Sequence, residues 1–198
     1  ASDVYKRQVC DVMELLDENR VIVKFGLSHM KNTSNQGLRA LMEVNGIDKG
    51  KLSAYHIGFV MGPCLNATGR LDTAVRALQL LEEEDRAEAV RIASDLKQLN
   101  DSRKEMTDIY VKQAVRSVEE NGLMQDRVLV IYLPDCHESL AGIIAGRIRE
   151  KYYKPVFVLT RGEEGVKGSG RSIEAYHMYE EMTRVRHLFT KYLSLIHI

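Results

Sequence analysis

The most regular pattern of hydrophobic and polar positions in the chain lies between residues 84 and 120. Apolar residues recur there every three or four positions, without proline or glycine, as in a helix with one buried face. Asn121 and Gly122 follow as a typical helix end. We therefore predict one long helix, roughly 50 Å in length, that connects two lobes. A coiled-coil or bundle helix is the alternative, because Asn100 and Arg103 interrupt the apolar stripe.

The region before this helix has helical periodicity, polar turns and no alternating strand pattern. We expect short helices that form part of a domain. Two segments place apolar residues on one helical face, where we expect them to pack in a core: Val21, Phe25 and Met30 in residues 18–30, and Leu38, Leu41 and Met42 in residues 37–44.

The region after the long helix changes to α/β. Residues 128–133 and 155–160 have the composition of strands, and residues 140–151 between them have a helical pattern. A strand, a helix and a second strand in close succession predict a parallel pair joined by a right-handed crossover. A stretch rich in glycine and serine, residues 167–173, then precedes another helix. The fold class is therefore α/β.

Composition and charge restrict the function. The 198 residues are 44% hydrophobic and 28% charged, which is typical of a globular protein, and no apolar run reaches the roughly 20 residues that span a bilayer. Lys and Arg together number 28, as do Asp and Glu, so the chain is not a globally basic nucleic-acid binder. Cys10, Cys64 and Cys136 are far apart and lack Cys-x-x-Cys spacing. They suggest neither a disulfide framework nor a zinc site and fit a reducing, cytoplasmic location.

The two ends of the chain look foreign to the rest. Residues 193–198 can be encoded by CTGTCTCTTATACACATC, and the reverse complement of that DNA encodes residues 3–8. This DNA resembles a transposase adaptor used to prepare sequencing libraries, whose upstream bases also encode residues 1 and 2. We therefore expect residues 1–8 and 193–198 to be adaptor-derived and non-native, and residues 9–192 to be an internal fragment of a longer protein.

The first cluster that can carry chemistry is Gly-Pro-Cys-Leu-Asn-Ala-Thr-Gly-Arg-Leu at residues 62–71, between two predicted helices. A loop of this kind can present Asn66, Arg70 and backbone N–H groups to an anion. The next helix would begin at Asp72 or Thr73. The alternative is a plain helix-to-helix turn capped by Asp72.

The second cluster is Gly-Val-Lys-Gly-Ser-Gly-Arg-Ser at residues 165–172. Its glycines allow close backbone approach, while Lys167, Ser169, Arg171 and Ser172 supply hydrogen-bond donors, so a phosphate would suit it. The sequence follows no Walker or dinucleotide pattern. A flexible surface hairpin is the alternative.

The third cluster, Cys136-His137-Glu138-Ser139, follows the first predicted strand. The carboxyl end of a strand next to a helix N-terminus is where α/β sheets place ligands. The alternative is that His137 caps the helix or packs against its neighbours.

Together, residues 62–71 with their Pro-x-Leu-Asn-Ala-x-Gly-Arg core, residues 137–147 and residues 167–173 resemble the Asp-His-His (DHH) phosphoesterases, and within them the single-stranded-DNA-specific exonucleases. The resemblance covers essentially all of residues 9–192. It implies the helical C-terminal part of a DHH domain at residues 9–83, a long linking helix at 84–121 and an incomplete α/β DHHA1 domain at 122–192. Single-stranded DNA would run through the cleft between the two domains.

The resemblance implies Mn²⁺- or Mg²⁺-dependent hydrolysis of single-stranded DNA from the 5′ end, as in DNA repair and recombination, with other repair proteins as partners. Asp11 matches the last metal-binding aspartate of the family, and the other ligands precede residue 9. This chain alone is therefore expected to be inactive. The residues expected to bind DNA are Asn66, Gly69, Arg70, His137, Ser169, Gly170 and Arg171.

Two departures from the family pattern matter. Cys64 stands where many members have arginine, which removes one expected DNA contact. After Tyr192 the family continues into a Gly-Gly-His stretch that is replaced here.

Two rival functions remain open. One is a DHH-family phosphodiesterase of short oligoribonucleotides or cyclic dinucleotides. The other is a non-catalytic DNA-binding scaffold of the same fold.

Overall fold

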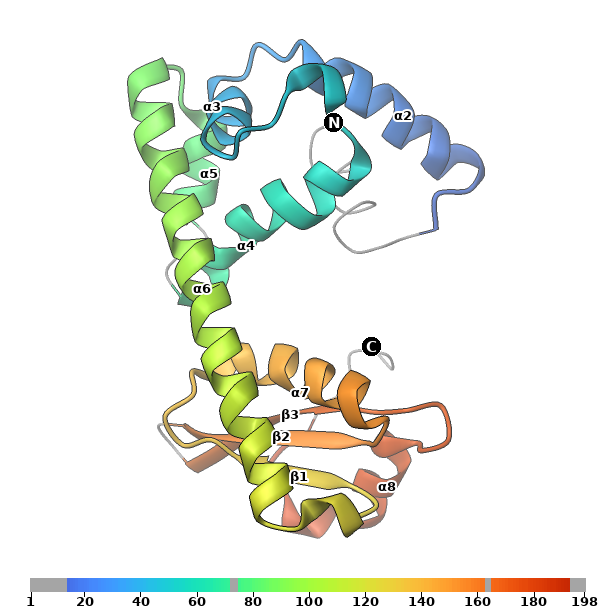
Figure 1. Ribbon diagram of the computed structural model, residues 1–198. Coiled ribbons are helices and arrows are strands. Elements are labelled where there is room, and N and C mark those ends of the chain that lie inside the picture. Colours follow the sequence, from blue (N-terminus) through green and yellow to red (C-terminus); the bar gives the residue numbers. More distant parts are fainter. Residues whose placement is uncertain (1–13, 72–74, 163–164, 193–198) are drawn as a thin grey trace. The chain divides into compact units, whose positions relative to one another are not determined.

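The computed structural model describes residues 14–71, 75–162 and 165–192 (Figure 1). The two ends that we expect to be adaptor-derived, and the expected helix start at Asp72 or Thr73, lie outside these residues. The chain divides into two compact units, residues 1–104 and 105–198. Helix α6 (Arg86–Glu120) runs through the boundary, and each unit has its own hydrophobic core. This helix confirms the prediction made from the periodicity of residues 84–120.

The described part of unit 1 is helical. Helix α3 (Gln36–Val44) is capped by Asn35, the residue before it. The side-chain oxygen of Asn35 accepts a hydrogen bond from the Leu38 N–H at 2.9 Å. The Asn35 amide also donates to the Leu81 carbonyl at 2.7 Å and ties α3 to the end of α5. The elements are α2 (Asp17–Lys31), α3 (Gln36–Val44), the 3₁₀ turn η1 (Lys49–Lys51), the π-helical segment η2 (His56–Met61), α4 (Gly62–Leu71), α5 (Val75–Glu82) and the first part of α6.

The core of unit 1 confirms the predicted face of α3, whereas of the three residues predicted for α2 only Met30 packs against the core. Leu41 and Met42 are buried against residues of α5 and α6. In contrast, Val21 and Phe25 are each 64% exposed. Helix α2 instead packs through the side that carries Val23 and Gly26, which are both buried. The apolar spacing was correct for a helix, but it did not identify which side meets the core.

Unit 2 is a small α/β domain. Strand β1 pairs with β2 in parallel and β2 pairs with β3 antiparallel, so the sheet order is β1-β2-β3. The parallel pair joined by a helix confirms the prediction from sequence. The elements after α6 are η3 (Leu123–Gln125), β1 (Leu129–Tyr132), α7 (Glu138–Tyr152), β2 (Val156–Gly162), β3 (Gly165–Arg171), α8 (Met178–Arg184) and η4 (Arg186–Leu188).

The core of unit 2 lies on one face of this sheet. Alternate residues of β1 are buried and exposed, as expected when one face of a strand meets a core. Helix α7 and the second part of α6 cover that face together (Figure 1). Fully buried side chains include Leu129, Ile131, Leu140, Ile144, Ile148 and Val156. No helix in the described part of the chain is both long and apolar enough to cross a membrane.

Candidate nucleic-acid interface

The predicted phosphate site at residues 165–172 is mainly a strand. Residues 165–171 form β3, which pairs with β2 as the second strand of a hairpin, so a hairpin rather than a loop is correct. Cross-strand partners point to the same side of a sheet. Arg171 pairs with the buried Val156, and Ser169 pairs with the buried Val158. Both side chains therefore lie on the face that α7 covers.

The side chains of Ser169 and Arg171 lie against the second turn of α7. A Cβ atom added to Gly142 would stand 2.9 Å from Nη2 of Arg171 and 3.5 Å from Oγ of Ser169. Nη1 of Arg171 donates to the carbonyl of Gly170 at 2.8 Å. Within the described residues, no carboxylate pairs with Arg171. A hydroxyl and a guanidinium without an acidic partner thus share one exposed edge of the sheet.

Lys167 extends this polar face toward the beginning of α7. Its Nζ atom lies 2.8 Å from a carboxylate oxygen of Glu138, the first residue of the helix. The hydrogen bond from Lys167 lowers the pKa of Glu138. Strand β3 therefore runs beside the first two turns of α7, with one ion pair at the helix start and the Ser169–Arg171 pair further along.

The glycines of β3 have a packing role on the opposite face. A Cβ at Gly170 would stand 2.4 Å from the sulfur of Met178, at the start of α8. A Cβ at Gly168 would stand 2.5 Å from a methyl group of Leu159. Both positions exclude larger side chains because neighbours already fill the space. The predicted DNA role of Gly170 stays a prediction, whereas its packing role is visible.

His137 is the N-cap of α7. Its backbone is extended, and its Nδ1 accepts from the Ser139 backbone N–H at 3.3 Å and lies 2.7 Å from the Ser139 hydroxyl. The cap follows β1 directly, at the carboxyl end of a parallel strand. This position allows the ligand-binding role that the sequence suggested, and the capping alternative is also correct.

Two contacts join α6 to the segment between β1 and α7 and to α7 itself. The hydroxyl of Tyr110, on α6, donates to the carbonyl of Asp135 at 2.6 Å. Arg147 of α7 forms an ion pair with Asp108 of α6. The adjacent Cys136 is buried, and desolvation raises the pKa of its thiol to about 11. Cys136 is therefore a neutral packing residue near pH 7, not an activated nucleophile.

The cluster at residues 62–71 is helix α4, so the predicted loop is wrong. Pro63 directly follows the π-helical segment η2 within one continuous helical run, so the chain stays helical through a residue that has no backbone N–H to donate. Cys64, Leu65 and Ala67 are buried in the core of unit 1, whereas Asn66 is exposed. The sulfur of Cys64 lies 3.8 Å from the side-chain oxygen of Asn45. Helix packing, more than turn chemistry, explains this sequence.

The remaining predicted residues of unit 1 have less structural support. Gly69 and Arg70 belong to the last turn of α4, and their side-chain surroundings are outside the description. Asp11, the predicted metal ligand, lies outside the described residues altogether. Within residues 14–71, 75–162 and 165–192, no group of three or more His, Cys, Asp or Glu side chains could hold a metal ion. These residues therefore do not form a Mn²⁺ or Mg²⁺ site by themselves.

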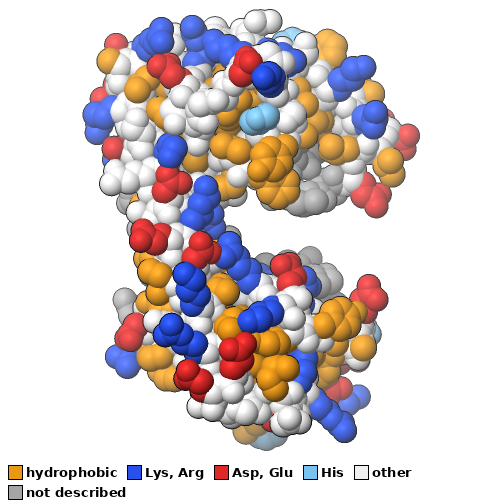
Figure 2. Space-filling view, in the orientation of Figure 1, with side chains coloured by type: hydrophobic (Ala, Val, Ile, Leu, Met, Phe, Trp, Pro, Cys, Tyr) orange, Lys and Arg blue, Asp and Glu red, His pale blue; other side chains and the backbone are white. Residues whose placement is uncertain are grey.

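Charge is distributed evenly over the visible surface. Figure 2 shows basic and acidic side chains interspersed on the face in view, in agreement with the zero net charge. Anion binding must therefore come from local groups such as Ser169 and Arg171. Nothing in the sequence pointed to Gly142, because only its position beside Arg171 in the folded chain gives it a role.

The sequence of unit 2 matches a known domain family. The DHHA1 domain model matches residues 125–190, which include all three strands, α7 and α8.

Longer relatives align with nearly the whole chain. The chain is 35% identical to the single-stranded-DNA-specific exonuclease RecJ of Bacillus subtilis, with 90% of this chain and 23% of that protein covered. It is 36% identical to RecJ of Escherichia coli, with 91% of this chain and 32% of that protein covered. The chain thus spans between about a quarter and a third of the length of these curated relatives.

Solved structures agree with these relatives. A crystal structure of exonuclease RecJ bound to manganese is similar with a TM-score of 0.83 and 29% identity, over 96% of this chain and 46% of that chain. RecJ from Thermus thermophilus in complex with Mg²⁺ is similar with a TM-score of 0.82 and 30% identity, over 96% of this chain and 29% of that chain.

Proposed function

The chain is a homologue of the single-stranded-DNA-specific exonuclease RecJ and contains a DHHA1 domain, and from this premise we propose that it contributes the phosphate-binding part of a metal-dependent 5′-to-3′ exonuclease of DNA repair and recombination. The observation that carries the proposal is the pair formed by Ser169 and Arg171 beside α7. Such a pair can hold a phosphate of single-stranded DNA at the 5′ end of the strand.

Three properties of this pair support a phosphate ligand. A guanidinium can donate two parallel hydrogen bonds to phosphate oxygens, and a serine hydroxyl can add a third. Arg171 has no carboxylate partner among the described residues, so its charge is available. The nearby N-terminus of α7 carries a partial positive charge that also favours an anion. His137 caps that terminus, and we propose that its exposed ring adds a contact to the DNA backbone.

Helix α4 supports a second set of DNA contacts in unit 1. Asn66 is exposed and has buried residues on both sides. Gly69 and Arg70 come three and four positions later, a spacing that places helix positions along one side. We propose that Asn66 and Arg70 bind the DNA backbone and that Gly69 leaves room for it. Cys64 is buried and uncharged, so this position offers no contact to DNA here.

Metal chemistry belongs to residues that the structure does not describe. The solved relatives are complexes with Mg²⁺ and Mn²⁺. In our proposal Asp11 is one ligand of such a cation in the complete enzyme, and a bound cation would supply an activated water molecule. The described residues contribute binding and orientation of the strand.

The proposal is tested by measuring the binding of fluorescent single-stranded DNA to the chain as a function of salt. We expect Arg171→Ala to weaken binding about tenfold, because a charge-assisted hydrogen bond contributes about 1.5 kcal/mol or more. The slope of log affinity against log salt should fall by roughly 0.7 for one lost phosphate contact. Affinity and slope equal to those of the parent chain would exclude Arg171 as a phosphate ligand.

A matched control and two competitors complete the experiment. Arg161 is exposed on β2 and points to the opposite face of the same sheet, since it pairs with Val166. Arg161→Ala should leave binding nearly unchanged. Unlabelled single-stranded DNA should compete better than short oligoribonucleotides or cyclic dinucleotides. The reverse order of competition would favour a phosphodiesterase of those smaller substrates.

A further inference from the structure

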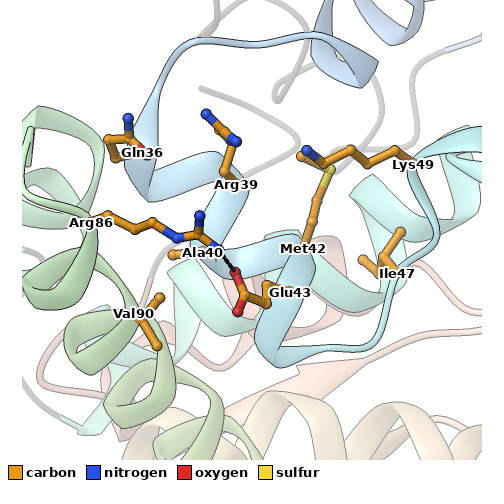
Figure 3. A pocket seen from close by; sticks show the side chains of 9 residues that line it. All are labelled: Gln36, Arg39, Ala40, Met42, Glu43, Ile47, Lys49, Arg86 and Val90. Atoms are coloured by element: carbon orange, nitrogen blue, oxygen red, sulfur yellow. Dashed lines mark hydrogen bonds and ion pairs between the residues drawn. The ribbon is translucent and has the colours of Figure 1, made fainter.

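Unit 1 contains a hollow that has no part in the proposed DNA contacts of α4 or β3. Its volume is about 230 Å³. Figure 3 shows its lining side chains, which come from α3, the segment that follows, η1 and the beginning of α6. The lining residues are Gln36, Arg39, Ala40, Met42, Glu43, Ile47, Lys49, Arg86 and Val90.

The rim of this hollow carries more positive than negative charge. It has three basic side chains, Arg39, Lys49 and Arg86, and one acidic side chain, Glu43. Glu43 pairs with Arg86 at 3.3 Å, and this pair is largely exposed. Within the described part of the chain, neither Arg39 nor Lys49 has a carboxylate partner. Two positive charges therefore border the hollow without an internal counterion.

The wall beside these charges is apolar. Ala40 and Met42 are buried, and Ile47 and Val90 are partly buried and pack against the same core. In Figure 3 the nitrogen atoms of Arg39 and Lys49 lie on one side of the hollow, and Val90 and Ala40 lie on another. Figure 3 also shows Met42 and Ile47 on the side of Lys49, and Ala40 and Val90 on the side of Arg86, so the hollow offers cations and apolar surface next to each other.

We propose that this hollow binds a nucleotide, with its phosphate between Arg39 and Lys49 and its sugar or base against Met42, Ile47 and Val90. A phosphate monoester carries between one and two negative charges at neutral pH, which matches the two uncompensated cations. The Arg39 guanidinium can donate two parallel hydrogen bonds to phosphate oxygens, and Lys49 adds a positive charge on a flexible side chain. The side-chain amide of Gln36 can donate or accept at the edge of a base.

The pair formed by Arg86 and Glu43 sets one border of this site. Because Glu43 already neutralises Arg86, the phosphate is directed to the other two cations. A ligand with charge spread along its whole length would meet the Glu43 carboxylate and the aliphatic wall. A ligand with its charge at one end avoids both, and a mononucleotide has this form.

The same phosphate chemistry can come from a free nucleotide or from one nucleotide of a DNA strand. The experiment therefore uses two probes with the full chain: dAMP, and a decathymidylate without terminal phosphate. Binding is measured by titration calorimetry at low salt in an Arg171→Ala background, which removes the proposed phosphate contact of unit 2. Failure of the DNA contact at β3 and failure of this site are thereby distinguished.

We expect dAMP to bind the Arg171→Ala chain and to bind at least tenfold more weakly when Arg39→Gln and Lys49→Gln are added. The matched control is the pair Arg20→Gln and Lys24→Gln, which removes the same charges from exposed positions on α2. This control should change dAMP affinity less than twofold. Stronger binding of the decathymidylate than of dAMP, with the same loss in the Arg39 and Lys49 variant, would identify a strand as the source of the phosphate and would contradict the preference for a ligand with its charge at one end.

Three results would overturn the proposal. The first is the absence of dAMP and decathymidylate binding to a chain that is folded by circular dichroism. The second is equal binding by the Arg39 and Lys49 variant and by its control. The third is competition by inorganic phosphate as effective as that of dAMP, because the aliphatic wall would then contribute nothing.

Discussion

Gly142 of α7 lies so close to Arg171 of β3 that a Cβ atom at Gly142 would stand 2.9 Å from Nη2 of the arginine. The same Cβ would stand 3.5 Å from Oγ of Ser169. The missing side chain of Gly142 therefore provides the space in which the guanidinium rests. A Cβ atom added to Gly146, one turn later on the same helix, would meet no neighbouring element within 4 Å. Gly142 therefore leaves room for Arg171, whereas Gly146 leaves room for no neighbouring side chain.

We predict that Gly142→Ala weakens binding of single-stranded DNA by displacing Arg171. The end of an arginine side chain is flexible, so the fold should accommodate the methyl group while the guanidinium moves. The loss of affinity and of salt dependence should resemble that of Arg171→Ala. In the double variant, Gly142→Ala should add little to the effect of Arg171→Ala, because both changes act on one contact.

Gly146→Ala is the matched control for this prediction. Alanine is favoured over glycine inside a helix by roughly 0.5–1 kcal/mol, so this variant should be more stable in urea unfolding. Its DNA affinity should equal that of the parent chain. Equal DNA binding by both alanine variants would show that Gly142 does not position Arg171.

Cys136 gives a prediction about the pH dependence of stability. Burial raises the pKa of its thiol to about 11 in the folded state, whereas an unfolded cysteine has a pKa of about 8.5. Between these values the unfolded chain releases a proton that the folded chain retains. The free energy of unfolding should therefore fall as pH rises through this window.

The measurement compares the parent chain with Cys136→Ser by urea unfolding from pH 8 to pH 11. The difference between the two free energies should shrink with increasing pH, by up to about 1.4 kcal/mol per pH unit. Ionisation of Cys64, and of lysines and tyrosines that do not interact with Cys136, occurs in both proteins and cancels in the difference, whereas the pKa of Tyr110 is raised by burial and also by Cys136. A difference that is constant with pH would contradict a buried, neutral thiol.

Thr160 of β2 is fully buried, and its hydroxyl has no hydrogen-bond partner among the described residues. A buried hydroxyl without a partner costs roughly 1–3 kcal/mol. Thr160→Val keeps the shape and removes this group, so we expect the free energy of unfolding to rise by about 1 kcal/mol. Thr160→Ala also removes a methyl group and should lower it. Urea midpoints measure both changes, and a destabilised valine variant would mean that the hydroxyl is satisfied.

The elements that depend on local periodicity could be predicted from the sequence. The long helix was expected at residues 84–120 and is found at Arg86–Glu120. The strand, helix and strand of unit 2 were also correct in order and in parallel pairing. These predictions succeed because a helix or strand with one buried face must repeat its apolar residues at a fixed interval.

The two glycine-containing clusters show what the sequence could not reveal. In residues 62–71, Pro63 and the glycines suggested a turn, although the helix continues from η2 through Pro63 and the adjacent apolar residues pack in a core. In residues 165–171, the glycines suggested a phosphate loop. Gly170 is required instead because Met178, eight positions later, packs across the strand. The structure of each cluster is decided by packing against residues that are distant in sequence or belong to another element.

Glu138 partly offsets the positive charge of the proposed DNA site, because its carboxylate lies 2.8 Å from Nζ of Lys167. Lys167 and Arg171 lie four residues apart on β3, and their side chains point to the same face of the sheet. Removing the carboxylate leaves the lysine with one less anionic neighbour and removes a charge that repels phosphate. We therefore predict that Glu138→Gln increases the affinity for single-stranded DNA.

The expected gain is about two- to fivefold at low salt, as for one exposed charge interaction, and it should disappear as salt is raised because exposed charges are screened. Glu174→Gln is the control, since it removes an exposed carboxylate from the segment that follows β3. Fluorescence anisotropy at several salt concentrations measures both variants. If Glu138→Gln binds no better than Glu174→Gln at low salt, then the Glu138 carboxylate does not weaken DNA binding at this site.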